Sequence, residues 1–361
     1  MKYGLLITSP INNYKNIGDY VQSLAALQFI PEGENYDYIE KEDIAHYSNK
    51  DSVKTIMNAW YMWHPENWPP QESAIDPLLT SIHITPLKAK EMLENGGKEY
   101  FIKHGPVGCR DTGTLEILQK NNIPSFFSAC LTLTLGEKYK YQGERNGVMF
   151  VDPYIPPIRY VHESGNIYYP KNVIKSFGYF LKSPKKIIKL SKKEFFKGRF
   201  YLQSLYNASM FYHAYSNLFE AEVLLNADYI SHMVKVKSDY TQKDLLSEAE
   251  SLVKKYARAK YVVTSRIHCA LPCIGLETPV MFVLDSMMES DQNIFNAPGR
   301  FGGLIDFFRV LNFNKKNKIV TFDKEIIEIG RIGENANFSN KTSWIEFRDK
   351  LVSQCKSFVV K

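Results

Sequence analysis

Arg266 and His268 are the two residues best suited to chemistry, because they stand two positions apart in the segment VVTSRIHCA (262–270). An apolar strand leads into them, and residues i and i+2 of an extended chain point to the same side. An arginine pairs with a carboxylate or a phosphate, and a histidine can donate a proton or a hydrogen bond near neutral pH. A helix that begins near Cys269 would add free backbone amides. The pattern predicts a donor site for a small anion, with a surface arginine and a buried structural histidine as the alternative.

A second candidate site is the segment NIGDYVQ (16–22), which follows the first apolar run. Gly18 would allow a tight turn after that strand, and Asp19 would then stand at the start of a helix. There the carboxylate either caps free amides or accepts a hydrogen bond from a substrate hydroxyl. We expect Asn16 and Asp19 on the acceptor side of the site, with Asp19 as a candidate catalytic residue.

Arg110 and Asp111 form a third candidate in GCRDTGT (108–114), at the end of a strand and just before a helix. Asp111 either caps that helix or acts with Arg110 on a polar ligand. We therefore keep Asp111 beside Asp19 as a candidate catalytic residue, and Arg110 as a candidate donor ligand.

His232 stands at another predicted strand end, in YISHMV. A lone histidine is more often structural, but this position also makes His232 a candidate donor ligand.

Three of the four tryptophans lie in one loop, NAWYMWHPENWPP (58–70). The loop is either part of the core or a lip on which sugar rings stack, and in the second case Trp60 and Trp63 bind the acceptor.

The segment NAPGRFGG (296–303) is rich in glycine and holds an arginine, but it matches no phosphate-loop or dinucleotide motif and is a weak phosphate signal. Cys130 lies among apolar residues and is expected to be an ordinary buried thiol.

Alternating strands and helices must position these residues. In the first half of the chain, apolar runs typical of strands alternate with amphipathic runs typical of helices. The strands are expected at 3–8, 53–60, 80–85 and 107–111, and the helices at 21–30, 88–101 and 114–122. This order predicts a parallel-sheet domain, and the polar segment KYKYQGERNG (138–147) is typical of a linker.

The second half repeats the alternation. Strands are expected from residue 148 and at 227–234 and 278–284, a helix at 245–259, a strand running into a helix at 260–276, and a last helix at 343–358. The fold class is therefore α/β, with two Rossmann-like domains that face each other across a cleft. We place an acceptor-side domain at 1–142, a donor-side domain at 143–335, and a C-terminal helix at 336–361 that packs back on the first domain.

Composition limits the class of protein. The 361 residues carry a formal net charge of +6, from 45 Lys and Arg against 39 Asp and Glu, an excess too small to indicate nucleic acid as a partner. Five cysteines without a CxxC pair make a disulfide framework or a metal site unexpected. No apolar stretch approaches the ~20 residues of a membrane span, and the short N-terminal run is unlike a signal peptide. We expect a soluble cytoplasmic protein.

The segment KSPKKIIKLSKKEFFKGR (182–199) holds eight basic residues and one acidic residue. It is either a solvated helix face or a patch for an anionic surface, such as a membrane leaflet or a lipid diphosphate. In the second case its lysines, over Lys185–Lys193, would bind peripherally to a membrane.

Three motifs in this order resemble the polysaccharide pyruvyl transferases: NIGDYVQSLAAL (16–27), the Arg-Asp pair near 110, and TSRIHCALPCIGLETPVMF (264–282). The resemblance implies a glycosyltransferase-B-like fold of two Rossmann-type domains. It implies phosphoenolpyruvate as the donor and a pyruvate ketal on a polysaccharide sugar as the product. It places Arg266 and His268 on the donor, and the family's first-domain Asp and Arg correspond either to Asp19 or to Arg110 and Asp111.

Ketal formation needs arginine clamps, a general acid at the methylene carbon of the donor, and a base near the sugar hydroxyl. Arg266 fits the role of the clamp, and His268 fits the role of a donor ligand or of the general acid. Asp111 or Asp19 fits the role of the base or of an acceptor anchor. The resemblance implies no cofactor. It implies a galactose-type acceptor in a capsular or exopolysaccharide precursor, linked to a polyprenyl diphosphate at the inner face of the membrane. The alternative function is a nucleotide-sugar glycosyltransferase of the same architecture.

Overall fold

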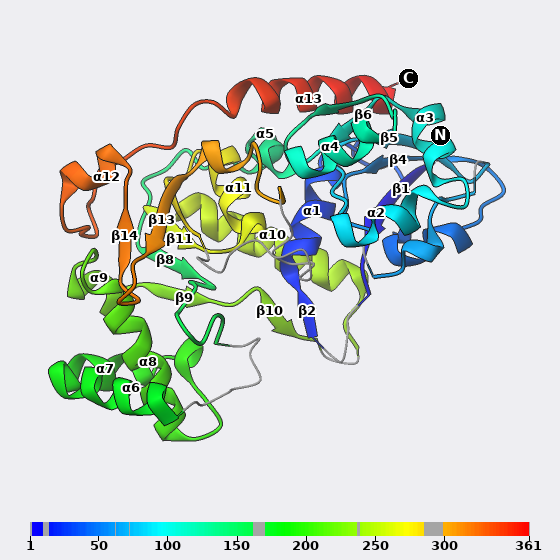
Figure 1. Cartoon of the computed structure of the whole chain (residues 1–361). Coiled ribbons are helices and arrows are strands. Elements are labelled where there is room, and N and C mark those ends of the chain that lie inside the picture. Colours follow the sequence, from blue (N-terminus) through cyan, green and yellow to red (C-terminus); the bar gives the residue numbers. More distant parts are fainter. Residues whose placement is uncertain are drawn as a thin grey trace.

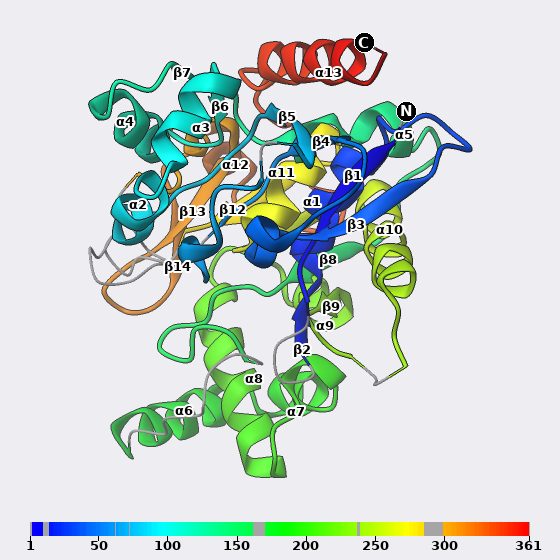
Figure 2. The same ribbon diagram turned by 90° about the vertical axis from the view of Figure 1, so that its right-hand side faces the viewer.

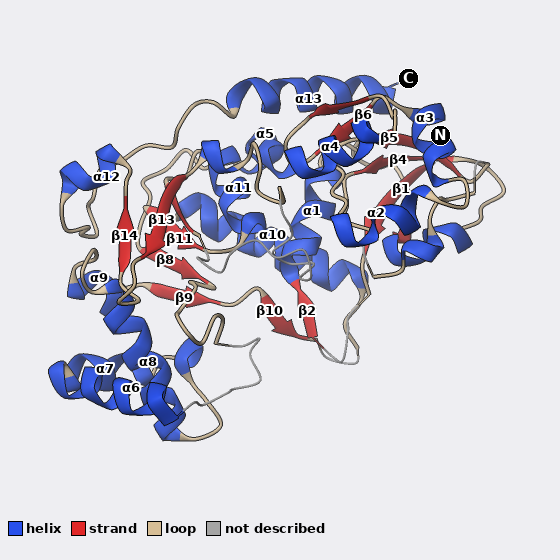
Figure 3. Cartoon of the chain, in the orientation of Figure 1, coloured by secondary structure: helices blue, strands red, loops and turns tan. Residues whose placement is uncertain are grey.

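The computed structural model of the chain describes residues 2–9, 14–61, 63–71, 73–161, 170–236, 239–284 and 299–360. Within them the protein is built on two larger sheets of mostly parallel strands and two small two-stranded sheets, with helices between and around the larger sheets (Figures 1 and 3). This arrangement confirms the predicted α/β class.

The first sheet contains the N-terminal part of the chain, and its four parallel strands run in the order β3-β1-β4-β5. They are β1 (Tyr3–Ile7), β3 (Tyr36–Glu40), β4 (Val53–Met57) and β5 (Ile75–Leu79). Every residue of β1 is buried, so its sequence YGLLI is apolar throughout and does not alternate. A parallel pair of short strands follows, β6 (Val107–Cys109) and β7 (Ser125–Phe127). After them come a 3₁₀ turn at Leu131–Leu135 and α5 (Gly136–Tyr139).

Two predicted elements in this part are wrong. The expected strand at 80–85 makes only isolated bridges, and the regular strand is β5 just before it. Pro77 hid that strand from the pattern, and β5 tolerates a proline because it lies at the edge of its sheet. The expected helix at 88–101 is two helices, α2 (Pro86–Leu93) and α3 (Gly97–His104), because Asn95 and Gly96 between them adopt φ values of 51° and 91°.

The second sheet has six strands in the order β14-β13-β12-β11-β8-β9. They are β8 (Val148–Val151), β9 (Asp228–Ile230), β11 (Tyr261–Thr264), β12 (Val280–Val283), β13 (Arg309–Phe313) and β14 (Ile319–Thr321). All neighbours are parallel except β14, which pairs antiparallel with β13 at one edge. The strands β8, β11 and β12 are entirely buried, as expected for a parallel sheet covered on both faces.

The predicted strand at 227–234 is two strands of different sheets. Its first part is β9, and its second part belongs to β10 (Met233–Lys235), which pairs antiparallel with β2 (Tyr14–Asn16). In this pairing Met233 lies opposite Asn16, and the backbone N–H of Ile17 donates to the carbonyl of His232 at 2.9 Å. The pairing therefore places the NIGD segment beside the YISH segment, although more than 200 residues separate them.

Three helices lie between the two sheets and pack against one another: α1 (Ile17–Leu27), α10 (Gln242–Arg258) and α11 (Ile267–Gly275) (Figure 1). Their apolar side chains belong to one buried cluster that also includes residues of β1, β8, β11 and β12. α10 is long and amphipathic, and a capping box between Thr241 and Asp244 holds its first turn. The shared core sets α1 and α11, which carry two of the sequence motifs, next to each other.

Three helices project from the second sheet, away from the first sheet: α6 (Pro170–Lys182), α7 (Pro184–Ser191) and α8 (Tyr201–Tyr215) (Figures 1 and 2). The chain returns to the second sheet through α9 (Ala221–Asn226) and passes α12 (Lys324–Ile329) near its end. The last helix, α13 (Ile345–Val360), reaches the first sheet, where the hydroxyl of Tyr3 donates to the carbonyl of Val359 at 3.1 Å. Across the described ranges, no helix combines the length and apolarity needed to cross a membrane.

Candidate active site

Candidate residues of several motifs follow the carboxyl ends of parallel strands. Arg110 comes directly after β6, Arg266 follows β11, and His232 follows β9. His83 and Asp152, which the sequence analysis did not select, follow β5 and β8. Ligands of parallel α/β folds bind at this end of the strands.

Arg266 and His268 do not share an extended segment, so the expected i, i+2 geometry is wrong. β11 ends at Thr264, Arg266 is the N-cap residue of α11, and His268 already lies in the first turn of that helix. The Thr264 hydroxyl accepts from the Arg266 backbone N–H at 3.0 Å and fixes this sharp change from strand to helix. The two side chains consequently have different partners.

Arg266 is held by Asp152 at the end of β8. Its Nε donates to Asp152 Oδ2 at 2.9 Å, and its guanidinium lies 4.1 Å from the centre of the Tyr160 ring. The same carboxylate oxygen accepts from the backbone N–H of His232 at 2.9 Å. Burial opposes the charge of Asp152, but Arg266 and His232 hold its pKa below the usual range. Asp152 also has a φ of 38°, a strained conformation that this network stabilises.

His268 is buried against α1. Its Nδ1 lies 3.3 Å from Nε2 of Gln22, and a Cβ placed on Gly18 would lie 3.2 Å from the Cβ of His268. With the Gln22 amide nitrogen facing Nδ1, Nδ1 is the acceptor and the proton is on Nε2. Within the described part of the chain, Nε2 is buried without a hydrogen-bond partner. The imidazole therefore presents an unused N–H group.

His232 is buried next to the same glycine. A Cβ on Gly18 would lie 3.0 Å from Nδ1 of His232, and Nε2 of His232 lies 2.7 Å from the Tyr256 hydroxyl of α10. Its side chain is thus part of the packing between α1 and α10, and its backbone N–H orients Asp152.

Asp111 is completely buried and has several partners. It is the N-cap residue of α4 (Thr112–Lys120) and accepts from the N–H of Thr114 at 3.0 Å and from its hydroxyl at 2.9 Å. Its other carboxylate oxygen lies 2.6 Å from Nδ1 of His83 and 3.2 Å from Nε of Arg110. Burial opposes ionisation, but these neighbours hold the pKa of Asp111 below its usual range.

His83 and Asp111 form a buried pair. Because Asp111 accepts the proton on Nδ1, the Nε2 atom of His83 carries a lone pair, and no described residue donates to it. Burial and the positive charge of Arg110 lower the pKa of His83 to about 4, so the imidazole is neutral at neutral pH. The pair resembles the carboxylate–histidine arrangement of many general bases.

Arg300 joins the site from the glycine-rich segment after β12. The N–H groups of Thr112 and Gly113 donate to the carbonyls of Gly302 and Gly299, at 3.1 and 3.3 Å. A Cβ on Gly302 would lie only 1.9 Å from the Thr112 hydroxyl oxygen, so this close approach requires glycine. The contact places the guanidinium of Arg300 over the Trp60 ring, 4.9 Å from its centre.

The charges of the three arginines affect the pKa values of neighbouring groups. The pKa of His268 is far below its usual value because of burial and because of the charges of Arg110 and Arg300. The pKa of Arg300 is lowered to about 9 by burial and then by Arg110, with Arg266 acting in the same direction. Three guanidinium groups from distant parts of the chain are therefore within electrostatic range, which suits a ligand with several negative charges.

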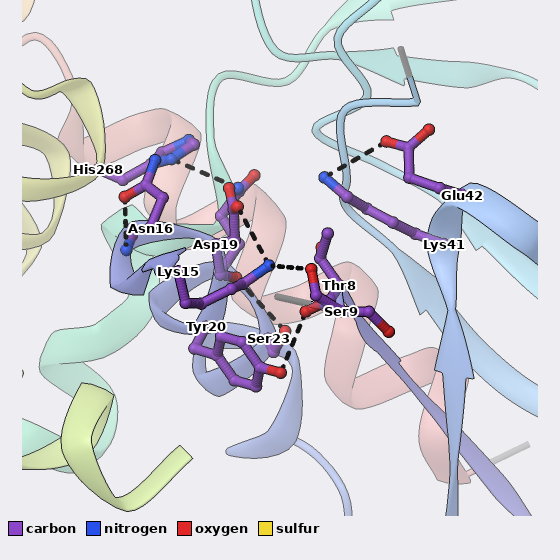
Figure 4. Close-up of polar contacts among 12 residues, drawn as sticks. Thr8, Ser9, Lys15, Asn16, Asp19, Tyr20, Ser23, Lys41, Glu42 and His268 are labelled. Carbon is purple, nitrogen blue, oxygen red and sulfur yellow. Dashed lines mark hydrogen bonds and ion pairs between the residues drawn. The ribbon is translucent and has the colours of Figure 1, made fainter. Parts of the chain in front are cut away.

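Asn16 and Asp19 lie beside His268 at the start of α1 (Figure 4). Asn16 is the N-cap residue, and its side chain accepts from the N–H of Gly18 at 3.1 Å. Asp19 is one-fifth exposed and lies 3.6 Å from the buried ammonium of Lys15. Burial lowers the pKa of Lys15 against the attraction of Asp19.

The aromatic loop divides into buried and exposed parts. Trp68 packs on Phe101 in the core of the first sheet, and Trp60 lies against His83 and Arg300. Trp63 is 43% exposed.

The remaining sequence candidates are the basic segment and Cys130, whose pKa is raised by burial and is also affected by the charges of Arg110 and Asp111. All five cysteines are free and buried, Cys130 among them. Of the basic segment, Lys185 and Lys186 are exposed, whereas Lys193 is half-buried and donates to the carbonyl of Ala227 at 2.8 Å. Among the described residues, no group of three or more His, Cys, Asp or Glu side chains could hold a metal ion.

Four residues that contact the candidate positions were missed: Gln22, His83, Asp152 and Arg300. Asp152 directly follows the buried strand β8, the kind of position that pointed to His232, so its signal was present in the sequence. His83 had no such signal, because it lay inside the strand expected at 80–85. Gln22 had no signal, because it lies inside a helix and its role depends on α11.

These features define an α/β protein with a cationic site at the carboxyl ends of its strands. The family model for polysaccharide pyruvyl transferases matches residues 80–286, more than half of the chain. The chain therefore belongs to the polysaccharide pyruvyl transferase family, as its motifs predicted, and is a transferase for pyruvyl transfer to a sugar in polysaccharide synthesis. A search of curated proteins returns no match.

Proposed function

We propose that the protein transfers pyruvate from phosphoenolpyruvate to two hydroxyl groups of one sugar, forming a cyclic ketal and releasing phosphate. The observation that carries the proposal is the proximity of three arginines: Asp111, His83 and Trp60 link Arg110 to Arg300, and the charge of Arg266 reaches Arg300. Phosphoenolpyruvate carries a carboxylate and a phosphate on a three-carbon skeleton, and such a polyanion needs several guanidinium groups close together. The reaction requires no cofactor.

Arg266 and Arg300 are the proposed donor clamps. The Nε atom of Arg266 donates to Asp152, and the ring of Tyr160 supports the guanidinium. These contacts orient the terminal nitrogens of Arg266 for a carboxylate or phosphate. Arg300 is supported by Trp60. Arg110 donates through Nε to Asp111, while its Nη1 is buried and has no hydrogen-bond partner in the described ranges. Bound donor would supply the acceptor oxygens that this nitrogen lacks.

His268 is the proposed proton donor. In the free protein its Nε2–H group is a hydrogen-bond donor, and two arginine charges oppose protonation of the ring. Bound phosphoenolpyruvate would neutralise those charges and raise the pKa of His268, which favours an imidazolium ion when the donor is present. Protonation of the methylene carbon makes C2 electrophilic. One sugar hydroxyl then forms a bond to C2, and the second hydroxyl forms another as the C2–O bond to phosphate breaks.

Each attacking hydroxyl must lose a proton, and we propose His83 and Asp19 for this step. Nε2 of His83 has the free lone pair of a base, and Asp111 acts through it as a positioning residue. Asp19 is partly exposed and can anchor or deprotonate an acceptor hydroxyl, together with Asn16. Trp63 is the proposed platform for the sugar ring. Trp60 is proposed to act indirectly, by supporting the guanidinium of Arg300.

The acceptor is proposed to be a galactose-type residue of a capsular or exopolysaccharide precursor on a polyprenyl diphosphate. Such a substrate places the protein at the inner face of the cytoplasmic membrane, where the lysines of Lys185–Lys193 face an anionic surface. The two sheets are proposed to form the two Rossmann-like domains of a glycosyltransferase-B-like fold, with the donor on the second and the acceptor on the first.

The test is phosphate release from phosphoenolpyruvate with a galactose-containing lipid-linked acceptor. Arg266→Ala, Arg300→Ala and His268→Ala should each lower kcat/KM at least a hundredfold. Arg331→Ala, a change at an exposed arginine near α12, is the matched control and should leave the rate unchanged. Wild-type rates in the site variants would overturn the assignment. Thermal stabilisation by UDP-, GDP- or CMP-sugars instead of phosphoenolpyruvate would indicate the glycosyltransferase alternative.

A further inference from the structure

Helix α6 exposes an apolar stripe. Val173, Ile174, Phe177 and Leu181 are 46%, 74%, 61% and 61% exposed. At 3.6 residues per turn these four side chains lie along one side of the helix, whereas Ser176 on the other side is buried against the rest of the protein. A contiguous group of large apolar side chains on a surface marks an interaction site.

The surroundings of the stripe carry one sign of charge. Between residues 170 and 193 the sequence has no Asp or Glu and has these lysines: Lys171, Lys175, Lys182, Lys185, Lys186, Lys189, Lys192 and Lys193. All of them except Lys193 are exposed. An apolar strip on a segment whose only charged residues are lysines is complementary to a surface with anionic groups above a hydrocarbon layer, which is the structure of an anionic bilayer.

The lysine-rich segment cannot supply the apolar part of such a contact itself. Of its apolar side chains, Ile188 is half-buried, and Ile187, Leu190, Phe195 and Phe196 are at most 4% exposed because they form part of the core beneath α7 and α8. The large exposed apolar residues therefore come from α6, and the exposed lysines come from both α6 and α7. Only the folded helical unit brings the two properties together.

We propose that α6 docks parallel to an anionic membrane surface, with Val173, Ile174, Phe177 and Leu181 at the boundary between headgroups and acyl chains. The lysines of α6 and α7 bind the lipid phosphates. The contact is peripheral and reversible, since a single amphipathic face and a basic patch hold a protein to a bilayer without spanning it. This membrane contact goes beyond pyruvyl transfer and does not depend on it, although it would bring the site to a lipid-linked acceptor.

Cosedimentation with vesicles tests the proposal. Vesicles of phosphatidylethanolamine with phosphatidylglycerol should bind the full-length protein, and vesicles of phosphatidylcholine alone should bind it far less. Phe177→Ser with Leu181→Ser should weaken binding at least tenfold. Lys185→Glu with Lys186→Glu should weaken it at least twentyfold, because each lysine near an anionic surface contributes about fivefold. High salt should weaken the binding of the wild type as the two lysine substitutions do. It should leave part of the binding that Phe177 and Leu181 contribute.

The matched control is Phe322→Ser with Ile327→Ser, which removes two side chains of similar exposure, 81% and 55%, near α12. This variant should bind vesicles like the wild type. A fluorescent label at Phe177→Cys should shift to shorter wavelength with anionic vesicles, and a label at Ile327→Cys should not. Equal binding by the stripe variant and the control would overturn the proposal. A dimer in solution that Phe177→Ser with Leu181→Ser dissociates would assign the stripe to a second copy of the chain instead.

The readouts separate this inference from the proposed function. Phosphate release with a water-soluble sugar acceptor should be unchanged in the stripe variant, whose substitutions lie on α6 outside the candidate active site. If phosphoenolpyruvate is not consumed at all but the vesicle results hold, the membrane contact stands and the proposed function fails. If the wild type does not bind anionic vesicles but still releases phosphate, the membrane contact fails and the proposed function stands.

Discussion

Gln22 on α1 contacts His268 on α11, with Nε2 of the amide 3.3 Å from Nδ1 of the imidazole. The two residues are 246 positions apart and belong to two of the three motifs that carry the family resemblance. The contact makes Nδ1 the acceptor, so the proton of the imidazole lies on Nε2. It links the NIGD helix directly to the RIH segment.

Replacing Gln22 should impair catalysis more than donor binding. In Gln22→Ala the imidazole of His268 can change tautomer or rotate, so we expect kcat for phosphate release to fall about tenfold, with a smaller change in KM for phosphoenolpyruvate. Gln28→Ala is the control on the same helix, because Gln28 bonds to Ala25 and Thr134 and has no contact with the site. The same kcat in both variants would show that the Gln22 contact has no role.

Gly18 should not tolerate a methyl group without loss of activity. A Cβ there would lie 3.0 Å from Nδ1 of His232, 3.1 Å from Oδ1 of Asn16 and 3.2 Å from the Cβ of His268, so these groups must shift. Gly178→Ala on α6 is the control: its Cβ would meet nothing within 4 Å, and it should stabilise the helix by about 0.5–1 kcal/mol. We expect Gly18→Ala to lower kcat without a gain in Tm. A Gly18→Ala protein that gains stability like the control and keeps full activity would contradict this packing.

Asp152 and Arg266 should be coupled in stability. Asp152→Ala leaves a guanidinium that is only 16% exposed without its counter-charge, which should cost about 3 kcal/mol in the free energy of unfolding. Urea unfolding of Asp152→Ala, Arg266→Ala and the double variant measures the coupling. The double variant should be less destabilised than the sum of the single variants. Strict additivity would mean that the ion pair contributes nothing.

His83 should make stability depend on pH. Its pKa is about 4 in the folded protein and near 6.5 when unfolded, so the unfolded chain binds the extra proton between these values. Stability should therefore be complete above about pH 6.5 and fall by about 3 kcal/mol as the pH drops to about 4. His83→Asn can still donate to Asp111 but cannot titrate, so its unfolding free energy should fall less over this range. Parallel curves for the wild type and His83→Asn would place the pH dependence elsewhere.

Much of the site's composition could be predicted from the sequence. The apolar runs before Arg110, Arg266 and His232 correctly indicated strand ends, because buried parallel strands have a distinct pattern and are followed by loops. The prediction was less successful where local pattern and chain geometry conflict. Thr264 and the N-cap turn replaced the expected extended geometry of Arg266 and His268, and Pro77 hid β5.

The difference between Asp19 and Asp111 illustrates which properties of a residue can be known only from the folded chain. Both are aspartates at the start of a helix, and the sequence offered no reason to separate them. In the structure Asp111 is fully buried and bound by His83, Arg110 and Thr114, whereas Asp19 is one-fifth exposed beside Lys15. Burial and partners depend on segments that are remote in the chain, so no local pattern contains them.

The sequence by itself determined the α/β class, the family, and the residue types that stand after each strand. Only the tertiary structure decided that the charges of Arg110 and Arg266 reach Arg300, that His83 pairs with Asp111, and that the lysines of α7 lie next to an exposed apolar stripe on α6. The physical reason is that strand patterns arise from burial along a few neighbouring residues. The charge and protonation of a site arise from contacts between elements that meet only when the two sheets pack around their shared helices.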